Sequence, residues 1–449
     1  MENNSYDLIV LGGGPGGYRA AERAGAQGKK VLLIEKENLG GVCLNHGCIP
    51  TKTLLHSAKL YRHGREGAQY GVHFEEARFD LSAAMKWKAR VVDTLIKGVA
   101  YQMKRFNVTV VQGVGSFVDR STLKVGNDTY QAKKVIIATG SSPVIIPIPG
   151  ADRENVVTSR QILEITKLPE SLVIIGGGVI GMEFASFFSS LDIKVHVIEM
   201  LEEIVPVLDP EIAKALRKAN PDIDFTLGAR VEKIDDQGVH FTKDGSPGLI
   251  GGELVLMSVG RRPNTAGIGL ENIGLDIGRS AIGVDEHMRT NLPGVYAVGD
   301  VTGKSLLAHC AYRMADVAIK DLMGQAARMR YNAVPSVIYT LPEAASCGLS
   351  REGAEGAGFE VRTANLPMRA NGRFLAEFDR EPGFCKIVVD KQSNVLLGVH
   401  MVGGNCSELI FGAAMMIEAE LRVQDVKDII FPHPTVSEII PDTLWELGH

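Results

Sequence analysis

Residues 6–35 read YDLIVLGGGPGGYRAAERAGAQGKKVLLIE, and this stretch decides the fold of the amino-terminal part. An apolar run, a glycine turn, an Ala-rich segment and a second apolar run predict a strand, a helix and a parallel strand. Gly12, Gly14 and Gly17 fit the spacing G-x-G-x-x-G. In this spacing the first Gly permits the turn, the second lets backbone approach a pyrophosphate, and the third lets helix pack on strand. Glu35 ends the second strand, where it can accept hydrogen bonds from an adenosine ribose.

The same pattern returns at residues 172–199, with Gly176, Gly178 and Gly181 in the turn and Glu199 at the end of the next strand. The acid follows the last Gly by eighteen residues in both copies. One such turn alone is weak evidence, whereas two copies with matched acids predict two dinucleotide sites. A carboxylate at the ribose 2′-position repels a 2′-phosphate, and no Arg closely follows Glu199, so the second copy favours NAD over NADP.

Composition excludes several classes of protein. The 449 residues carry 48 basic and 53 acidic side chains, a formal charge of −5, so neither nucleic acid nor an anionic membrane is an expected partner. The first apolar run is too short for a signal peptide or a membrane span, and we expect a cytoplasmic protein. Six cysteines are too few for a secreted disulfide scaffold. Four of them, at positions 310, 347, 385 and 406, are far apart in the sequence and are expected to be buried.

Two further apolar strands end in small residues. Residues 135–140 end with Thr139 and Gly140, and residues 295–300 end with Asp300. Each is compatible with an ordinary exit from a strand into a turn. The presence of two dinucleotide units supports a second interpretation, in which Asp300 binds a ribityl or phosphate group of a flavin.

Cys43 and Cys48 form the only closely spaced cysteine pair, with the spacing C-x4-C. A regular helix would hold their side chains about 140° apart, but Asn45 and Gly47 permit an irregular backbone between them. Pro50 suits the first turn of a following helix and places Cys48 just ahead of it, where the helix dipole stabilises a thiolate. Two buried free thiols or half a metal site are the alternatives. No second close Cys or His pair completes a zinc site, so no metal is expected.

The carboxyl terminus sets His433 between two prolines, and Glu438 follows five residues later. His is the side chain suited to deprotonating a dithiol near neutral pH, and Glu438 could hold its tautomer. The alternative is a capped turn with a solvated His.

Together these motifs resemble the flavin disulfide reductases, the FAD-dependent pyridine nucleotide-disulfide oxidoreductases, over essentially the whole chain. Residues 40–52, GGVCLNHGCIPTK, are similar to the redox-active motif of that family, and residues 292–300, LPGVYAVGD, to its second flavin motif. Residues 433–438, HPTVSE, match its carboxyl-terminal active-site motif. The chain departs from the family at Phe431 and at His46, where relatives carry His and an apolar residue.

The resemblance implies a role for each matching residue. Cys43 would be the thiol that meets substrate, and Cys48 the thiol against the flavin. Lys52 and Glu183 would pair beside the flavin and nicotinamide, rather than being a solvated helix residue and a surface charge. The carboxyl-terminal domain would form a homodimer, so that His433 reaches the cysteines of the other subunit.

The implied fold is α/β, with two Rossmann-type dinucleotide-binding domains and a carboxyl-terminal α+β dimerisation domain. The predicted domains are 1–148 for FAD, 149–272 for NAD, 273–331 as a central segment that completes the FAD site, and 332–449 for the interface. The predicted FAD-binding residues are Gly12, Gly14, Pro15, Gly17, Glu35, Lys52, Thr139, Gly140, Asp300 and Ala308. The predicted NAD-binding residues are Gly176, Gly178, Gly181, Glu199 and Gly260.

The expected activity is the oxidation of dihydrolipoyl groups with NAD⁺, through the Cys43–Cys48 disulfide and FAD. The lipoyl group would be carried by another protein, of a 2-oxoacid dehydrogenase or glycine cleavage system. A reductase of glutathione or another small disulfide that runs on NADPH is one alternative. An oxidase or transhydrogenase of the same fold is another. A flavin-bearing subunit that binds partners without turnover is a third, of a different class.

Overall fold

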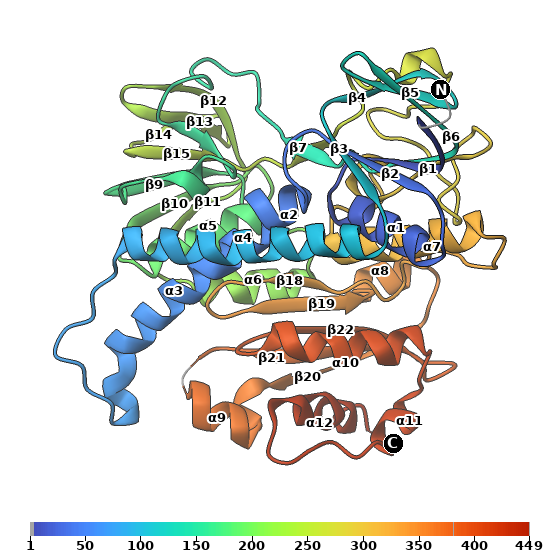
Figure 1. The fold of residues 1–449 in the computed structure, drawn as a ribbon. Helices are drawn as coiled ribbons and strands as arrows, with labels where there is room; N and C mark the ends of the chain where they lie inside the picture. Colours follow the sequence, from blue (N-terminus) through green and yellow to red (C-terminus); the bar gives the residue numbers. More distant parts are fainter. Residues whose placement is uncertain (1–3, 380, 449) are drawn as a thin grey trace. The chain divides into compact units, whose positions relative to one another are not determined.

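The computed structural model describes residues 4–379 and 381–448 (Figure 1). The chain divides into two compact units. Unit 1 comprises residues 1–53, 82–144 and 260–330, and unit 2 comprises residues 54–81, 145–259 and 331–449. Each unit combines parts of several predicted domains, so the four predicted ranges stay a prediction.

Unit 1 is built on one sheet in the order β3-β2-β1-β6-β5-β4, and β17 pairs with the last residues of β6, 135–137, beyond the part that pairs with β5. Neighbours among β3, β2, β1, β6 and β17 run parallel. The apolar residues of β1, β2, β17 and the end of β6 are mostly buried, as expected for the centre of a sheet covered on both faces, whereas β3 is largely exposed. The strands are β1 (Ser5–Leu11), β2 (Val31–Glu35), β3 (Thr109–Gln112), β4 (Gly115–Asp119), β5 (Thr122–Val125), β6 (Asp128–Ile137) and β17 (Val295–Ala297). A separate pair joins β7 (Ser141–Pro143) to β16 (Arg261–Pro263).

Helix α1 (Pro15–Ala26) follows the first glycine turn and packs along α7 (Ala308–Leu322) (Figure 1). It begins earlier than the Ala-rich segment suggests, because Gly14 is its N-cap and Pro15 occupies the first helical position. Two helices follow β2: α2 (Gly41–His46) and the start of α3 (Cys48–Glu66). Helix α4 (Leu81–Arg105) lies later in the chain.

Unit 2 contains a second parallel sheet in the order β11-β10-β9-β15-β8, and α5 (Val179–Ser189) follows its glycine turn. A three-stranded antiparallel sheet, β12-β13-β14, follows in the chain. The bounds are β8 (Val156–Thr158), β9 (Ser171–Ile175), β10 (Lys194–Ile198), α6 (Pro210–Lys218), β11 (Ile223–Thr226), β12 (Ala229–Asp235), β13 (Gly238–Lys243), β14 (Ser246–Ile250) and β15 (Leu254–Met257).

The carboxyl-terminal part of unit 2 is an antiparallel sheet, β18-β19-β22-β21-β20, which shares an apolar core with α10 and α12 (Figure 1). The two parallel sheets and this α+β domain confirm the predicted α/β fold class. The bounds are β18 (Ser336–Ile338), β19 (Ala344–Gly348), α8 (Arg351–Gly356), β20 (Val361–Pro367), α9 (Gly372–Phe378), β21 (Phe384–Asp390), β22 (Leu396–Val402), α10 (Cys406–Glu418), α11 (Val423–Lys427) and α12 (Ile439–Trp445). Among residues 4–379 and 381–448, no helix has both the length and the apolar character needed to cross a bilayer.

Candidate active site

The first glycine turn has the backbone geometry of a pyrophosphate cradle. Gly12 has φ +107°, and a Cβ there would lie 2.3 Å from the carbonyl oxygen of Ala138. A Cβ on Gly17 would lie 1.7 Å from the oxygen of Gly12. In contrast, the nearest atom to a Cβ on Gly14 is 3.8 Å away. The turn therefore needs Gly at its ends, whereas the middle position keeps room for a ligand beside the amino terminus of α1.

Glu35 is held at this turn by two backbone amides. Its carboxylate accepts hydrogen bonds from Gly13 N at 2.6 Å and from Glu37 N at 2.7 Å. Each carboxylate oxygen has a second lone pair, so the group can still accept a ribose hydroxyl. These contacts fit an adenine dinucleotide on unit 1.

Unit 2 repeats this arrangement of a glycine turn and a carboxylate that accepts from two backbone amides. Gly176 has φ +105°, and a Cβ on Gly181 would lie 2.1 Å from the carbonyl oxygen of Gly176. No atom lies within 4 Å of a Cβ on Gly178. Glu199 accepts hydrogen bonds from Gly177 N at 2.6 Å and Leu201 N at 2.8 Å. The residues of the second turn therefore fit a second dinucleotide, with a carboxylate where NADP would need a cation.

The carboxyl ends of β1, β6 and β17 meet at one edge of the unit 1 sheet, because these strands are parallel neighbours. This edge brings Asp300 within 2.5 Å of Ser141 Oγ, which donates to its Oδ2. Arg261 donates from Nε to Ser141 Oγ at 2.8 Å. Burial raises the pKa of Asp300, while Ser141 and the Arg261 cation oppose that rise. Ser141 and Arg261 were missed from the sequence, because their positions show no motif spacing relative to Asp300.

The other predicted flavin residues lie in the same unit. Thr139 and Gly140 follow β6, and Thr139 Oγ1 donates to the Asn264 carbonyl at 2.7 Å. Ala308 is the first residue of α7. Gly260, predicted for the NAD site, has φ +114° and belongs to unit 1, so its place beside the NAD turn stays a prediction.

The cysteine pair spans a break between two helices. Cys43 lies on α2, Cys48 is the first residue of α3, and Gly47 between them has φ −148° and ψ −109°. Asn45 Nδ2 donates to the carbonyls of Leu39 and Gly41, so the Asn45 side chain ties the end of α2 to its first residue and to the segment before it. The prediction that Cys48 precedes the helix was wrong by one residue. Helix α3 already begins at Cys48, because Pro50 tolerates the third helical position, where its missing N–H has no partner to lose.

The two thiols interact directly, and both are half-buried free thiols in this structure. The hydrogen bond to Cys48 is the main cause that raises the pKa of Cys43, followed by burial, while Lys52 acts in the opposite direction. The Cys43 thiol therefore keeps its proton at neutral pH. The remaining cysteines, at positions 310, 347, 385 and 406, are buried as expected.

His433 and Glu438 are brought together as predicted. His433 Nδ1 lies 3.0 Å from Glu438 Oε1, and the His side chain is 81% exposed. The Thr435 amide donates to the other Glu438 oxygen at 2.9 Å. That amide and then His433 lower the pKa of Glu438, which keeps its carboxylate charged beside the imidazole. Nε2 of His433 is the ring nitrogen on the side away from Glu438, which suits a base that an acid orients.

Glu183 is a buried residue of α5 and not a surface charge, with an exposed fraction of 3%. Its Oε1 accepts a hydrogen bond from Tyr339 N at 3.2 Å within unit 2. Lys52 is half-buried in unit 1. The two residues belong to different units, and their pairing stays a prediction.

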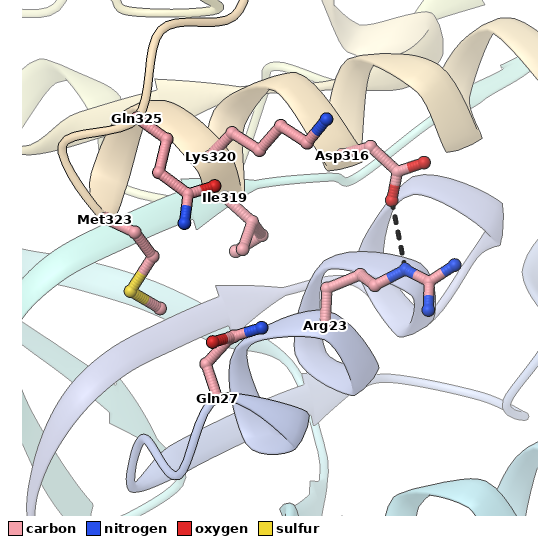
Figure 2. A pocket seen from close by; sticks show the side chains of 7 residues that line it. All are labelled: Arg23, Gln27, Asp316, Ile319, Lys320, Met323 and Gln325. Carbon is pink, nitrogen blue, oxygen red and sulfur yellow. Dashed lines mark hydrogen bonds and ion pairs between the residues drawn. The ribbon is translucent and has the colours of Figure 1, made fainter.

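A surface pocket between α1 and α7 contains none of the predicted site residues (Figure 2). Figure 2 shows Arg23 of α1 bonded to Asp316 of α7, at 3.2 Å between Nε and Oδ1. Among residues 4–379 and 381–448, no group of three or more His, Cys, Asp or Glu side chains is arranged to hold a metal.

Comparison with known proteins identifies the family. Residues 6–315 match the pyridine nucleotide-disulphide oxidoreductase family, and residues 334–444 match the dimerisation domain of that family. Dihydrolipoyl dehydrogenase 3 of Pseudomonas aeruginosa is 39% identical, and dihydrolipoyl dehydrogenase of Bacillus subtilis is 38% identical. In both cases the match covers 97% of this chain and 96% of the relative.

Solved structures agree with this assignment. LpdA from Mycobacterium tuberculosis superposes with a TM-score of 0.90 at 28% identity, covering 98% of this chain and 99% of that one. The HOCl-induced flavoprotein disulfide reductase RclA from Escherichia coli reaches 0.87 at 29% identity, with the same coverage. The chain therefore belongs to the pyridine nucleotide-disulphide oxidoreductases, a family that combines FAD with NAD(H), and it ends in the dimerisation domain of that family.

Proposed function

We propose that this protein is a dihydrolipoyl dehydrogenase, which oxidises protein-bound dihydrolipoyl groups to lipoyl groups with NAD⁺. The observation that carries the proposal is the Cys43–Cys48 pair, held across a helix break in the unit that also carries the first dinucleotide turn. The similarity to curated dihydrolipoyl dehydrogenases over nearly the full chain supports the substrate class.

The residues of this chain divide the chemistry between them. His433, oriented by Glu438, removes a proton from one substrate thiol, and the resulting thiolate attacks Cys43 Sγ of the disulfide. That attack breaks the Cys43–Cys48 bond, forms a mixed disulfide on Cys43 and leaves Cys48 as a thiolate. The second substrate thiol then gives up its proton and closes the lipoyl ring, while Cys43 leaves with the electron pair of the mixed disulfide and takes up a proton. The substrate has then lost two electrons to the cysteine pair and two protons, one held by His433 and one by Cys43. Bound FAD would supply the redox chemistry that links the reduced cysteine pair to NAD⁺.

The cofactors would be held by residues already described. The turn of Gly12, Gly14 and Gly17 with Glu35, and the edge that carries Asp300, would hold FAD. The turn of residues 176–181, with Glu199, would hold NAD, and its carboxylate favours an unphosphorylated ribose.

We further propose that each active site is shared across a homodimer, with His433 of one subunit serving the cysteines of the other. The match of residues 334–444 to a dimerisation domain supports this arrangement. The lipoyl group would come from a separate carrier protein of a 2-oxoacid dehydrogenase or glycine cleavage system, and a cytoplasmic location is proposed with it.

Steady-state formation of NADH from dihydrolipoamide and NAD⁺ tests the substrate, beside a parallel assay with NADPH and glutathione disulfide. Rapid NADH formation with no turnover in the second assay is the expected pattern. The reverse pattern would keep the fold and refute the lipoyl substrate. Cys48→Ser should abolish turnover with dihydrolipoamide.

Coexpression of Cys43→Ser with His433→Gln tests the shared site. Each variant alone should be inactive. If subunits pair at random, half of the dimers are hybrids of the two variants. Each hybrid has one intact active site and one site that lacks both residues, so the mixture should show about a quarter of wild-type activity. No recovered activity in isolated hybrids would refute the shared site.

A further inference from the structure

The segment between β10 and α6, residues 199–209, bonds to the second glycine turn. Val205 N donates to the carbonyl oxygen of Gly177 at 2.9 Å. Gly177 N donates to Glu199 Oε2 at 2.6 Å. Ile204 packs on the same glycine, because a Cβ on Gly177 would lie 3.0 Å from Ile204 Cγ2. Both polar backbone groups of Gly177 are therefore held by residues that lie outside the turn.

Val205 makes its bond in a conformation that valine disfavours. Its φ is +42°, in the left-handed region, and its side chain is fully buried. A β-branched residue is rarely found there, because its Cβ comes too close to the following carbonyl oxygen. Pro206 follows, and the residue before a proline is ordinarily extended. Such a conformation persists only where the surrounding structure imposes it.

The first glycine turn has the same contact, made by a glycine. Gly40 N donates to the carbonyl oxygen of Gly13 at 2.8 Å, and Gly13 N donates to Glu35 Oε2 at 2.6 Å. Gly40 has φ +96°, in a region that glycine adopts without strain. Leu39 packs on this turn as Ile204 does on the other, with its Cδ2 3.1 Å from a Cβ on Gly13. The contact therefore occurs in both units, although only the residue in unit 1 is suited to the conformation.

The bond to the Gly177 oxygen fixes one peptide plane of the second turn. The peptide between Gly177 and Gly178 is planar and trans, so its N–H points away from its C=O. Gly178 is the N-cap of α5, and no atom lies within 4 Å of a Cβ placed on it. Its N–H is therefore one of the amides that can face a phosphate at the start of this helix. Holding the Gly177 oxygen sets the direction of that N–H before a dinucleotide binds.

Further contacts anchor the segment that carries Val205. Arg217 of α6 donates to the Glu203 carboxylate from Nε at 2.7 Å and from Nη2 at 2.9 Å. Leu208 N donates to the Val205 oxygen at 3.0 Å. These contacts fix the segment on both sides of Val205, so its N–H stays directed at Gly177.

We propose that Val205 is a positioning residue of the NAD site. Its N–H holds the Gly177 carbonyl, and this bond directs the Gly178 N–H at the NAD pyrophosphate. The inference rests on the proposed NAD site at residues 176–181 and does not depend on the lipoyl substrate. The strained φ of Val205 is retained because an extended backbone at this position would turn its N–H away from Gly177.

The test removes the Val205 N–H and keeps the side chain. Cell-free translation places the hydroxy acid of valine at position 205 of the FAD-loaded protein, so that an ester oxygen replaces the N–H. The two probes are ADP-ribose and adenosine, whose binding to the oxidised protein is measured by calorimetric titration. Both carry the ribose that Glu199 can bind, only ADP-ribose carries the pyrophosphate, and neither accepts a hydride.

The expected result is a contrast between the two probes. The ester should weaken ADP-ribose binding by about 10- to 100-fold, as for loss of a hydrogen bond to a charged group, and change adenosine binding by less than about 3-fold. Val205→Pro should lose ADP-ribose binding in the same way, because proline has no N–H and cannot adopt a positive φ. Val205→Gly keeps the N–H and takes the conformation without strain, so ADP-ribose binding should stay within about 3-fold of wild type.

An ester at Val255 is the matched control, because Val255 is also a buried valine of unit 2 and the same hydroxy acid replaces it. Its N–H donates to the Asn155 oxygen at 2.8 Å and not to the glycine turn. This ester should leave the binding of both probes unchanged.

Unchanged ADP-ribose binding in the Val205 ester, with normal FAD content, would overturn the proposal. An equal loss for adenosine, or an equal loss in the Val255 ester, would also overturn it. Failure of the wild-type protein to bind ADP-ribose would refute the NAD site at residues 176–181 and the role of Val205 with it. The expected contrast in a protein that does not turn over dihydrolipoamide would refute the lipoyl substrate and support the role of Val205.

Discussion

Replacing Lys386 by Met should destabilise unit 2 strongly. Lys386 lies on β21 with an exposed fraction of 1%, and its Nζ bonds to Asp209 Oδ2 at 2.9 Å and Glu211 Oε1 at 2.8 Å. Asp209 is 2% exposed and also caps α6 by accepting from the Glu211 amide at 3.0 Å. Met fills a similar volume but leaves the Asp209 carboxylate buried without its cation, which costs about 3–5 kcal/mol.

The assay is thermal unfolding followed by circular dichroism. For a domain of about 150–250 residues, each kcal/mol moves the midpoint by about 2–4 °C, so a fall of roughly 6–20 °C is expected. Lys391→Met is the control, because its 3.6 Å pair with Glu360 is exposed and should contribute less than about 1 kcal/mol. Adding Asp209→Asn to Lys386→Met should restore most of the midpoint, since no buried charge remains. Equal midpoints for Lys386→Met and wild type would refute the reasoning.

The same residue predicts a pH dependence. Burial alone would lower the pKa of Lys386, but its two carboxylates outweigh burial and raise it above 10.5. Its stabilising contribution is therefore complete below pH 10.5 and is lost as the pH rises through the raised pKa. The difference in midpoint between wild type and Lys386→Met should shrink in that alkaline range and stay constant between pH 7 and 9.

Two further variants test the site. Gly17→Ala should abolish flavin binding, measured by absorbance of the purified protein, because its Cβ would lie 1.7 Å from the Gly12 oxygen. Gly98→Ala, with no atom within 4 Å of its Cβ, should bind flavin normally, and equal loss in both would contradict the steric argument. Glu438→Gln should slow NADH formation by about 100-fold or more, because His433 loses the acid that orients it. Unchanged turnover would show that Glu438 does not orient the base.

Much of the site could be predicted because the residues concerned are close together in the sequence and form short motifs. Each glycine turn and its acid lie within one strand–helix–strand unit, and the contacts of Glu35 and Glu199 repeat each other. The spacing of Cys43 and Cys48 likewise predicted the break at Gly47. His433 and Glu438 are five residues apart, close enough for one turn to join them.

Contacts between distant segments could not be predicted in this way. Lys386 interrupts the apolar run of residues 384–389, FCKIVV, and a lone Lys is a residue that is almost never fully buried unless it is paired. Its buried partner Asp209 is 177 residues away. Ser141 bonds to Asp300 across 159 residues, and Tyr18 meets Tyr312 across 294.

The sequence by itself determined two nucleotide turns, the helix-breaking cysteine pair and the His–Glu turn, because backbone sterics and short side-chain reach act between near neighbours. Only the tertiary structure decided which polar groups are buried together, as for Tyr18 with Tyr312 and around Lys386. Such a group is stable inside the protein only when a distant segment supplies its partner, and no local spacing specifies that segment.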